Sequence, residues 1–211
     1  IGDMVNNDPE IGDNLKVVYL PNYRVSLAEK IIPASDLSEQ ISLAGTEASG
    51  TGNMKFALNG ALIIGTMDGA NIEIAEEAGE ENLFIFGLRA NEVEDVRKKG
   101  YNPMEYIEKF PALQKILFLI ECGFFSPEKG DLFKPIVDTL KYHDPFMIMA
   151  DMPMYLDAHS RAEKVYEDHE AWTKKCITCV AHQGKFSSDR TIMEYAKDIW
   201  EVKPMKVDYE S

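Results

Sequence analysis

The sequence predicts an α/β fold in which a doubly wound parallel sheet is followed by a helical C-terminal tail. Two short apolar runs, ALIIGT at 61–66 and NLFIFG at 82–87, have the length and composition of strands buried on both faces. Stretches with helical spacing alternate with them, which is typical of a parallel sheet covered by helices. After about Pro103 no further buried strand is evident. We therefore divide the chain into an α/β part, 1–103, and a helical part of the same domain, 104–211.

Local signals predict the other elements of the first half. KVVYL, at 16–20, is rich in β-branched and aromatic residues and predicts a strand. VSLAEKII, at 25–32, predicts a short helix that ends at Pro33, because proline cannot continue a helix. GANIEIAEEAG predicts a helix with Gly79 as its C-terminal cap.

Helical periodicity dominates from residue 91 onward. NEVEDVRKKG, at 91–100, opens with acids and closes with bases, which matches the dipole of a helix. The later helical stretches are PMEYIEKFPALQKILFLIECGFF, interrupted by Pro111, then LFKPIVDTLKYHD, MYLDAHSRAEKVYEDHEAWTKKCITCVAHQGK and SSDRTIMEYAKDIW. Ser187 or Ser188 is suited to cap the last of them.

Composition and charge restrict the classes of function. The 211 residues are 45% hydrophobic, which is ordinary for a globular protein with a sizeable core. The net charge of -14 excludes a broad basic surface, so we expect no nucleic-acid and no membrane partner. No apolar run approaches the roughly 20 residues of a membrane span. Three cysteines and a polar, acidic opening segment fit a reducing compartment, so we expect a cytoplasmic location.

Cys176 and Cys179 form a C-x-x-C pattern, and His182 follows at the same spacing. Zinc binding is one interpretation, but a tetrahedral site would need a fourth ligand that is not evident here. The other interpretation is packing, because the two cysteines lie on one face of a predicted helix and buried cysteines behave as small hydrophobes. We favour packing and predict no metal site.

The stretch GTEASGTGNMKFALNG, at 45–60, places a glycine-rich loop before a predicted helix that contains Lys55. Small residues at a helix N-terminus expose backbone N–H groups and form an anion site. We expect Lys55 to be partly desolvated by its apolar neighbours, which favours the neutral, nucleophilic form of an amine. A neutral lysine beside an anion site suits pyridoxal phosphate. An ordinary solvated lysine after a flexible loop is the alternative, because the phosphate-loop pattern is absent.

The stretch from NYRVS to LFIFG, at 22–87, closely resembles the pyridoxal-phosphate region of the glycogen phosphorylases, the α-glucan phosphorylase family. So does KFSSDRTIMEYAKDIW in the tail, and the resemblance extends along essentially the whole chain. The family implies a two-lobed glycosyltransferase fold with two Rossmann-like domains and an active site between them. This chain resembles only the C-terminal part of the second domain. We therefore expect a partial sheet, with the N-terminal lobe and the basic segment that clamps the substrate phosphate missing from this chain.

The resemblance also assigns roles around the cofactor, pyridoxal 5'-phosphate. Lys55 matches the lysine that carries the cofactor, and Thr51 and Gly52 lie where the family supports the cofactor phosphate. Tyr23 and Arg24 match the NYRVS stretch beside the cofactor. The candidate catalytic residues are accordingly Lys55, Thr51 and Arg24. For Arg24, a surface ion pair is the alternative.

Substrate recognition is implied for a neighbouring segment. Glu47, with the backbone of Ala48, Ser49 and Gly50, matches the segment that hydrogen-bonds the glucosyl hydroxyls in the family. A carboxylate that accepts two hydroxyl hydrogen bonds gives strong, directional recognition. The alternative for Glu47 is a capping or loop-stabilising acid.

The implied reaction is the phosphorolysis of an α-1,4-glucan such as glycogen by inorganic phosphate, which releases glucose 1-phosphate. In the family the cofactor phosphate relays a proton, the complete protein is a homodimer, and allosteric control acts through the N-terminal lobe. We expect the 211-residue chain alone to be inactive. Two alternatives stay open: a pyridoxal-phosphate enzyme of amino-acid metabolism, which would need an acid at the pyridine nitrogen and an arginine for the substrate carboxylate, and a non-catalytic isolated domain.

Overall fold

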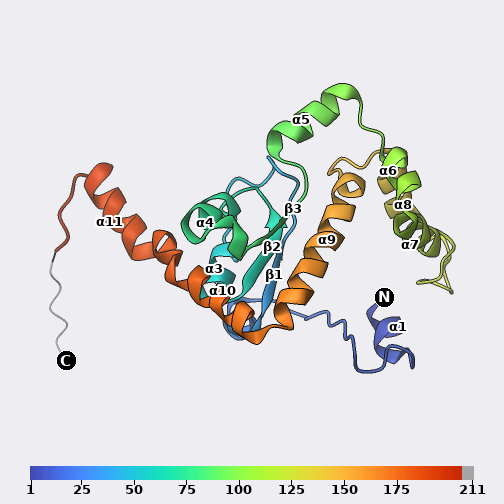
Figure 1. Ribbon diagram of the computed structural model, residues 1–211, viewed down its shortest axis with the longest axis horizontal. Helices are drawn as coiled ribbons and strands as arrows, with labels where there is room; N and C mark the ends of the chain where they lie inside the picture. The colour runs from blue at the N-terminus through green and yellow to red at the C-terminus, as the bar shows by residue number, and fades with distance from the viewer. Residues whose placement is uncertain (206–211) are drawn as a thin grey trace.

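The computed structural model, described over residues 1–205, contains a three-stranded parallel sheet with helices on both faces (Figure 1). The strands β1 (Leu37–Gln40), β2 (Leu62–Thr66) and β3 (Phe84–Phe86) pair in the order β1-β2-β3. Leu37 lies opposite Leu62, and Ile64 lies opposite Phe84. The predicted α/β class is confirmed. The sheet is partial, since no fourth strand extends it within the described residues.

Helices make up most of the remaining regular structure. In chain order they are α1 (Gly2–Asn7), α2 (Val25–Ile31), α3 (Gly52–Leu58), α4 (Asn71–Ala78), α5 (Ala90–Lys99), α6 (Pro103–Lys109), α7 (Pro111–Glu121), α8 (Lys134–Tyr142), α9 (Ile148–Tyr166), α10 (His169–Ala181) and α11 (Ser188–Asp198). Short 3-10 segments are η1 (Ile32–Ala34), η2 (Glu80–Asn82) and η3 (Gln183–Phe186). Within residues 1–205, no helix is both long and apolar enough to cross a membrane.

The central strand β2 is buried because its side chains alternate between two helical layers. Leu62 and Ile64 share an apolar cluster with Ala158 of α9. Ile63 points to the other face and packs with Ile74 of α4. A further apolar cluster joins α6, α7 and α8 to the first turn of α9. A continuous apolar sequence at β2 is thus required by burial on both faces.

Most of the elements predicted from the sequence are present. The runs at 61–66 and 82–87 contain β2 and β3, and Gly79 caps α4 with a φ of 90°. Pro111 separates α6 from α7. Ser187 occupies the N-cap position of α11, although its side chain makes no capping hydrogen bond. The division into 1–103 and 104–211 stays a prediction, and its last residues, 206–211, lie outside the described part of the chain.

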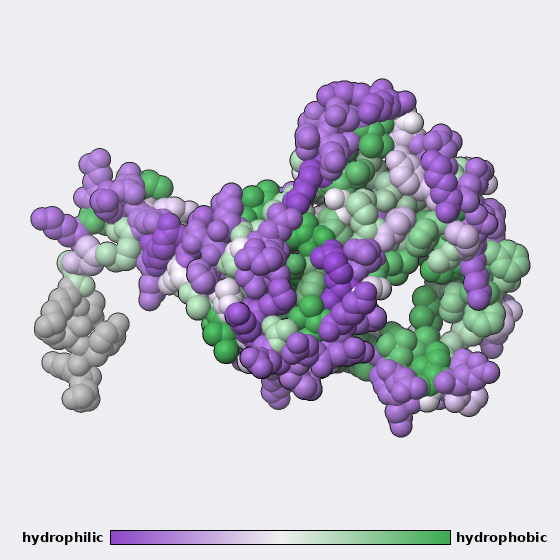
Figure 2. Space-filling view, viewed as in Figure 1, coloured by the Kyte–Doolittle hydropathy of each residue, from purple (hydrophilic) through white to green (hydrophobic). Residues whose placement is uncertain are grey.

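The strand predicted at 16–20 is wrong. These residues have no regular secondary structure, and Val18 and Tyr19 are 70% and 94% exposed. Their β-forming composition has no effect because no described strand lies beside them, and a strand needs a neighbouring strand for its backbone hydrogen bonds. The backbone of Val17 pairs instead with the side chain of Asn6, at 2.8 Å in both directions. An apolar patch is visible where this N-terminal segment runs, at the lower right of the surface (Figure 2).

The sequence predicts no strand at β1, whose residues are LSEQ. This strand has little apolar character of its own and only Ser38 is buried. It forms because it pairs along its length with β2. Its importance is positional, since the chain continues from β1 through 41–44 into the glycine-rich loop.

Candidate functional site

The glycine-rich loop, 45–51, lies at the carboxyl edge of the sheet. It follows β1, and a second short connection, 67–70, follows β2. Since the two strands are parallel and adjacent, both connections leave the sheet at the same edge. Parallel α/β sheets bind their ligands at this edge, outside the carboxyl ends of the strands.

Asp68, in the second connection, holds the start of the loop. Its Oδ1 accepts a hydrogen bond from the backbone N–H of Gly45 at 3.0 Å. Its Oδ2 accepts hydrogen bonds from the N–H groups of Thr46 at 3.2 Å and Glu47 at 2.8 Å. Asp68 is buried, with 7% of its surface exposed. A carboxylate suits this position because both of its oxygens accept hydrogen bonds and neither donates. Sequence reasoning missed Asp68.

Gly69 allows the two connections to touch. Its φ is +50°, and a Cβ added there would lie 2.5 Å from the carbonyl oxygen of Ser49. That oxygen accepts a hydrogen bond from the N–H of Ala70 at 2.7 Å. In the loop itself, Gly45 and Gly50 have φ values of +90° and +80°. The glycines are therefore explained by left-handed backbone and by close contact, both of which favour a residue without a Cβ.

Two buried asparagines join the start of α3 to the start of α4. The Nδ2 of Asn53 donates to the Oδ1 of Asn71 at 3.0 Å, and the Nδ2 of Asn71 donates to the carbonyl oxygen of Thr66 at 2.9 Å. Neither asparagine is more than 3% exposed. Buried amides paired in this way fix the relative position of the two helices, because an unpaired buried donor or acceptor is costly.

Lys55 lies in α3, and its side chain is exposed, so the expected partial desolvation is wrong for this structure. The reason is its position on the helix. Asn53 and Ala57 face the core, and Lys55 lies midway between them, on the opposite side at about 100° per residue. Leu58, on the same side as Lys55, is 43% exposed. Within residues 1–205, no carboxylate forms an ion pair with Lys55.

The other predicted loop residues are adjacent to Lys55. Thr51 is the N-cap of α3 and its side chain makes no capping hydrogen bond, and Gly52 is the first helical residue. Glu47, Ala48 and Ser49 are exposed. The carboxylate of Glu47 accepts no hydrogen bond from any described residue, and it is Asp68 that stabilises the loop. This argues against the loop-stabilising alternative for Glu47.

Tyr23 and Arg24 are not brought to the loop. They precede α2, which leads through η1 to the amino end of β1, whereas the loop leaves its carboxyl end (Figure 1). Tyr23 is 63% exposed, and the Nε of Arg24 donates to the Oγ of Ser26 at 3.1 Å. The described part of the chain offers Arg24 no ion-pair partner.

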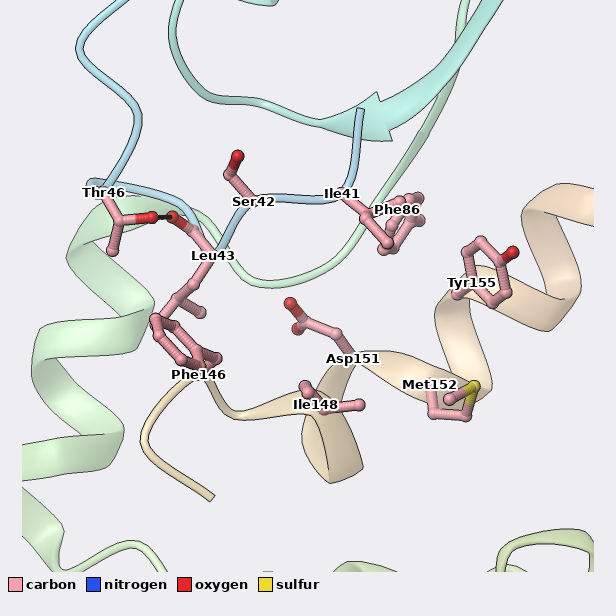
Figure 3. A pocket seen from close by; sticks show the side chains of 10 residues that line it. All are labelled: Ile41, Ser42, Leu43, Thr46, Phe86, Phe146, Ile148, Asp151, Met152 and Tyr155. Carbon is pink, nitrogen blue, oxygen red and sulfur yellow. Dashed lines mark hydrogen bonds between the residues drawn. The ribbon is translucent and has the colours of Figure 1, made fainter. Parts of the chain in front are cut away.

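An apolar pocket of about 450 Å³ adjoins the loop, and none of the predicted site residues lines it (Figure 3). Phe86 and Leu43 lie on one side, with Ile148 on the other. Asp151 of α9 points into it; burial raises the pKa of this carboxyl, and its Oδ1 accepts a hydrogen bond from the N–H of Leu88 at 3.0 Å. The pocket and the loop share the backbone after β1, where Thr46 belongs to both.

The C-x-x-C pattern lies away from this edge. Cys179 is 3% exposed and packs in the same cluster as Phe84 and Trp172, as the packing interpretation predicts. Burial raises the pKa of its thiol to about 11, and burial also raises the pKa of the Cys176 thiol. Across residues 1–205, no group of three or more His, Cys, Asp or Glu side chains is placed to hold a metal ion.

Comparisons with known proteins give one family along nearly the whole chain. A family model described as carbohydrate phosphorylase matches residues 1–202. The brain form of glycogen phosphorylase from Mus musculus is 60% identical over 204 residues, which cover 97% of this chain and 24% of that protein. The muscle form from Ovis aries is 59% identical over 206 residues, which cover 98% of this chain and 24% of the relative. The chain thus spans about a quarter of the length of the curated relatives it matches.

Proposed function

The chain belongs to the carbohydrate phosphorylase family, and from that premise we propose that it is part of an enzyme that phosphorolyses an α-1,4-glucan such as glycogen to glucose 1-phosphate. The observation that carries the proposal is that Glu47 and Lys55 lie on one short segment. Both side chains are exposed, and the backbone between them is tied to the connection after β2. A sugar-binding acid and a cofactor-binding amine are thus presented from one anchored segment.

The residues around α3 fit pyridoxal 5'-phosphate by the chemistry of their donors. Lys55 offers an exposed amine, and Thr51 offers a hydroxyl that makes no capping hydrogen bond. In the proposal Lys55 anchors the cofactor, while Thr51 and the N–H of Gly52 hold its phosphate. When bound, the cofactor supplies a phosphate that acts as an acid–base group. No metal ion is part of the proposal.

Substrate recognition is assigned to the loop. Glu47 accepts hydrogen bonds from glucosyl hydroxyls, and the backbone of Ala48, Ser49 and Gly50 adds further polar groups. A charged acceptor with no side-chain partner among residues 1–205 is suited to this role, because it gains a hydrogen bond on binding without breaking one to those residues. Inorganic phosphate is the second substrate.

Several parts of the proposal rest on the resemblance alone. Tyr23 and Arg24 are assigned to the cofactor only by their match to the NYRVS stretch. A homodimeric assembly and allosteric control have the same basis, whereas a cytoplasmic location is proposed from the three cysteines and the polar, acidic opening segment. The relatives are about four times as long as this chain. We therefore assign the complete active site to a longer protein and expect the 211 residues alone to be inactive.

The experiment that tests the proposal labels the cofactor lysine. The native-length protein is loaded with pyridoxal phosphate, reduced with borohydride and digested, and the pyridoxyl group is located by mass spectrometry. We expect the label on Lys55. A label on Lys30 or another lysine would refute the assignment.

A second measurement tests the reaction itself. Glycogen and inorganic phosphate are supplied to the native-length protein and, in parallel, to residues 1–211, both with pyridoxal phosphate. We expect glucose 1-phosphate from the former only, because positioning of reactants in a cleft supplies about 7–11 kcal/mol of barrier lowering. Comparable turnover by the 211-residue chain would show that its site is self-contained.

A further inference from the structure

Three consecutive backbone N–H groups, those of Gly45, Thr46 and Glu47, converge on the carboxylate of Asp68. Such a convergence does not arise from a regular helix or strand. The N–H of Thr46 is shared with the carbonyl of Leu43 at 3.0 Å, whereas the carboxylate is the one described acceptor for Gly45 and Glu47. It fixes the orientation of three successive peptide groups. These donors give both oxygens of the Asp68 carboxylate hydrogen bonds although the side chain is buried.

The connection after β2 also contacts the side chain of Glu47, through Gly69. A Cβ added at Gly69 would lie 3.1 Å from the Cγ of Glu47. Asp68 therefore fixes the backbone of Glu47, and the neighbouring Gly69 lies against the stem of its side chain. Glu47 is exposed, while Asp68 holds its backbone N–H and Gly69 lies against the base of its side chain.

The helix that carries Lys55 is held by a different contact. The buried pair Asn53 and Asn71 ties the start of α3 to α4, without using Asp68. The loop and α3 thus have separate anchors: Asp68, in the connection after β2, holds the loop, and Asn71, the first residue of α4, holds α3. A change at Asp68 is expected to weaken sugar binding. A change at Asn53 or Asn71 is expected to weaken cofactor binding.

We infer that Asp68 is a positioning residue for sugar recognition: its carboxylate holds 45–47 in the conformation that presents Glu47 to the glucosyl hydroxyls. The inference rests on the proposed function, because it takes the ligand of Glu47 to be a sugar. Asp68 does not touch the substrate. It acts through the backbone of Glu47.

The test is Asp68→Asn in the native-length protein. An amide replaces one accepting oxygen with a donor that faces backbone N–H groups, so the loop loses its conformation while the shape of the side chain is kept. We expect the KM for glucose 1-phosphate to rise about tenfold or more, as for a lost hydrogen bond to a charged group. The content of bound pyridoxal phosphate, read from its absorbance, stays unchanged.

Asp151→Asn is the matched control, because Asp151 is also a buried carboxylate that accepts a backbone N–H at the same edge of the sheet. It should leave the KM unchanged. The double variant Asp68→Asn with Glu47→Gln should raise the KM little beyond Glu47→Gln alone, since residues that act through one another are not additive. If Asp68→Asn does not fold, Gly69→Ala keeps the carboxylate, displaces Ser49 and Glu47, and should raise the same KM.

The outcomes separate the two hypotheses. If the unmodified protein shows no phosphorolysis, the proposed function is refuted, and the inference fails with it. If the unmodified protein is active but neither Asp68→Asn nor Gly69→Ala changes the KM, only the inference is overturned. A parallel loss of sugar affinity and of bound cofactor would also overturn it, because Asp68 would then support the fold in general.

Discussion

Replacing Asn71 with alanine should destabilise the protein, because this side chain supplies the acceptor for the buried amide of Asn53. Its Oδ1 accepts from Asn53, and its Nδ2 donates to the carbonyl of Thr66. Removal leaves the Nδ2 of Asn53 unpaired in the core, whereas the carbonyl of Thr66 keeps the hydrogen bond that it accepts from the N–H of Asp68 at 2.9 Å. At about 1–3 kcal/mol for one unsatisfied buried group, we expect a loss of about 1–3 kcal/mol in the free energy of unfolding.

The measurement is urea unfolding of the native-length protein, followed by fluorescence. Asn59→Ala is the matched control, since Asn59 also makes a side-chain hydrogen bond, to the carbonyl of Lys55 at 2.8 Å, but is exposed. The control should cost no more than about 0.5 kcal/mol. Asn71→Asp should also be destabilising, because a carboxylate can accept from Asn53 but cannot donate to Thr66. Equal stability of Asn71→Ala and Asn59→Ala would refute the reasoning.

Three further predictions concern single side chains. Glu47→Gln should raise the KM for glucose 1-phosphate by the equivalent of about 1.5–3 kcal/mol and leave the cofactor content unchanged, and an unchanged KM would contradict the assigned role. Cys122, which is exposed, should react with a thiol reagent at about pH 8, whereas Cys179, whose thiol pKa is raised to about 11 by burial, should react only on unfolding; mass spectrometry of the modified peptides decides this. Burial, and the hydrogen bond to Glu39 at 2.8 Å, raise the pKa of Tyr155 from 10.0 to about 12. The stability that this shift provides is complete below about pH 10 and is lost as the pH rises toward 12. The decrease in unfolding free energy at alkaline pH should therefore be smaller in Tyr155→Phe than in the unmodified protein. Identical pH profiles of the two proteins would contradict this role of Tyr155.

The buried elements of the fold could be predicted because their sequences reflect burial directly. β2 has no polar side chain between Leu62 and Ile64, since helices cover both of its faces. β1 could not be predicted in this way, because its stability comes from pairing with β2 and not from its own composition. The segment 16–20 has the opposite property: its composition favours a strand, but no strand in the described residues pairs with it.

The sequence indicates candidate site residues but not their arrangement. Thr51 and Lys55 are singled out by their chemistry beside a glycine-rich loop, and Glu47 by the resemblance to the phosphorylase family. Asp68 gave no comparable signal, since an acid after a strand is common and its partners are backbone groups more than 20 positions earlier in the chain. The exposure of Lys55 depends on which face of α3 packs, and its apolar sequence neighbours did not determine that.

The carboxylate of Asp68 should protect the loop after β1 from hydrogen exchange, although the loop has no regular secondary structure. Amide protons in an exposed loop normally exchange with deuterium quickly, but those of Gly45, Thr46 and Glu47 are engaged by a buried acceptor. Exchange at Gly45 and Glu47 requires the connection after β2 to open, so these two amides should exchange at a common slow rate together with the amide of Ala70, whose partner is Ser49. The amide of Thr46 also donates to the carbonyl of Leu43 at 3.0 Å, so it should exchange no faster. We therefore expect the loop to open together with the beginning of α4, and not with β1, the strand that precedes the loop.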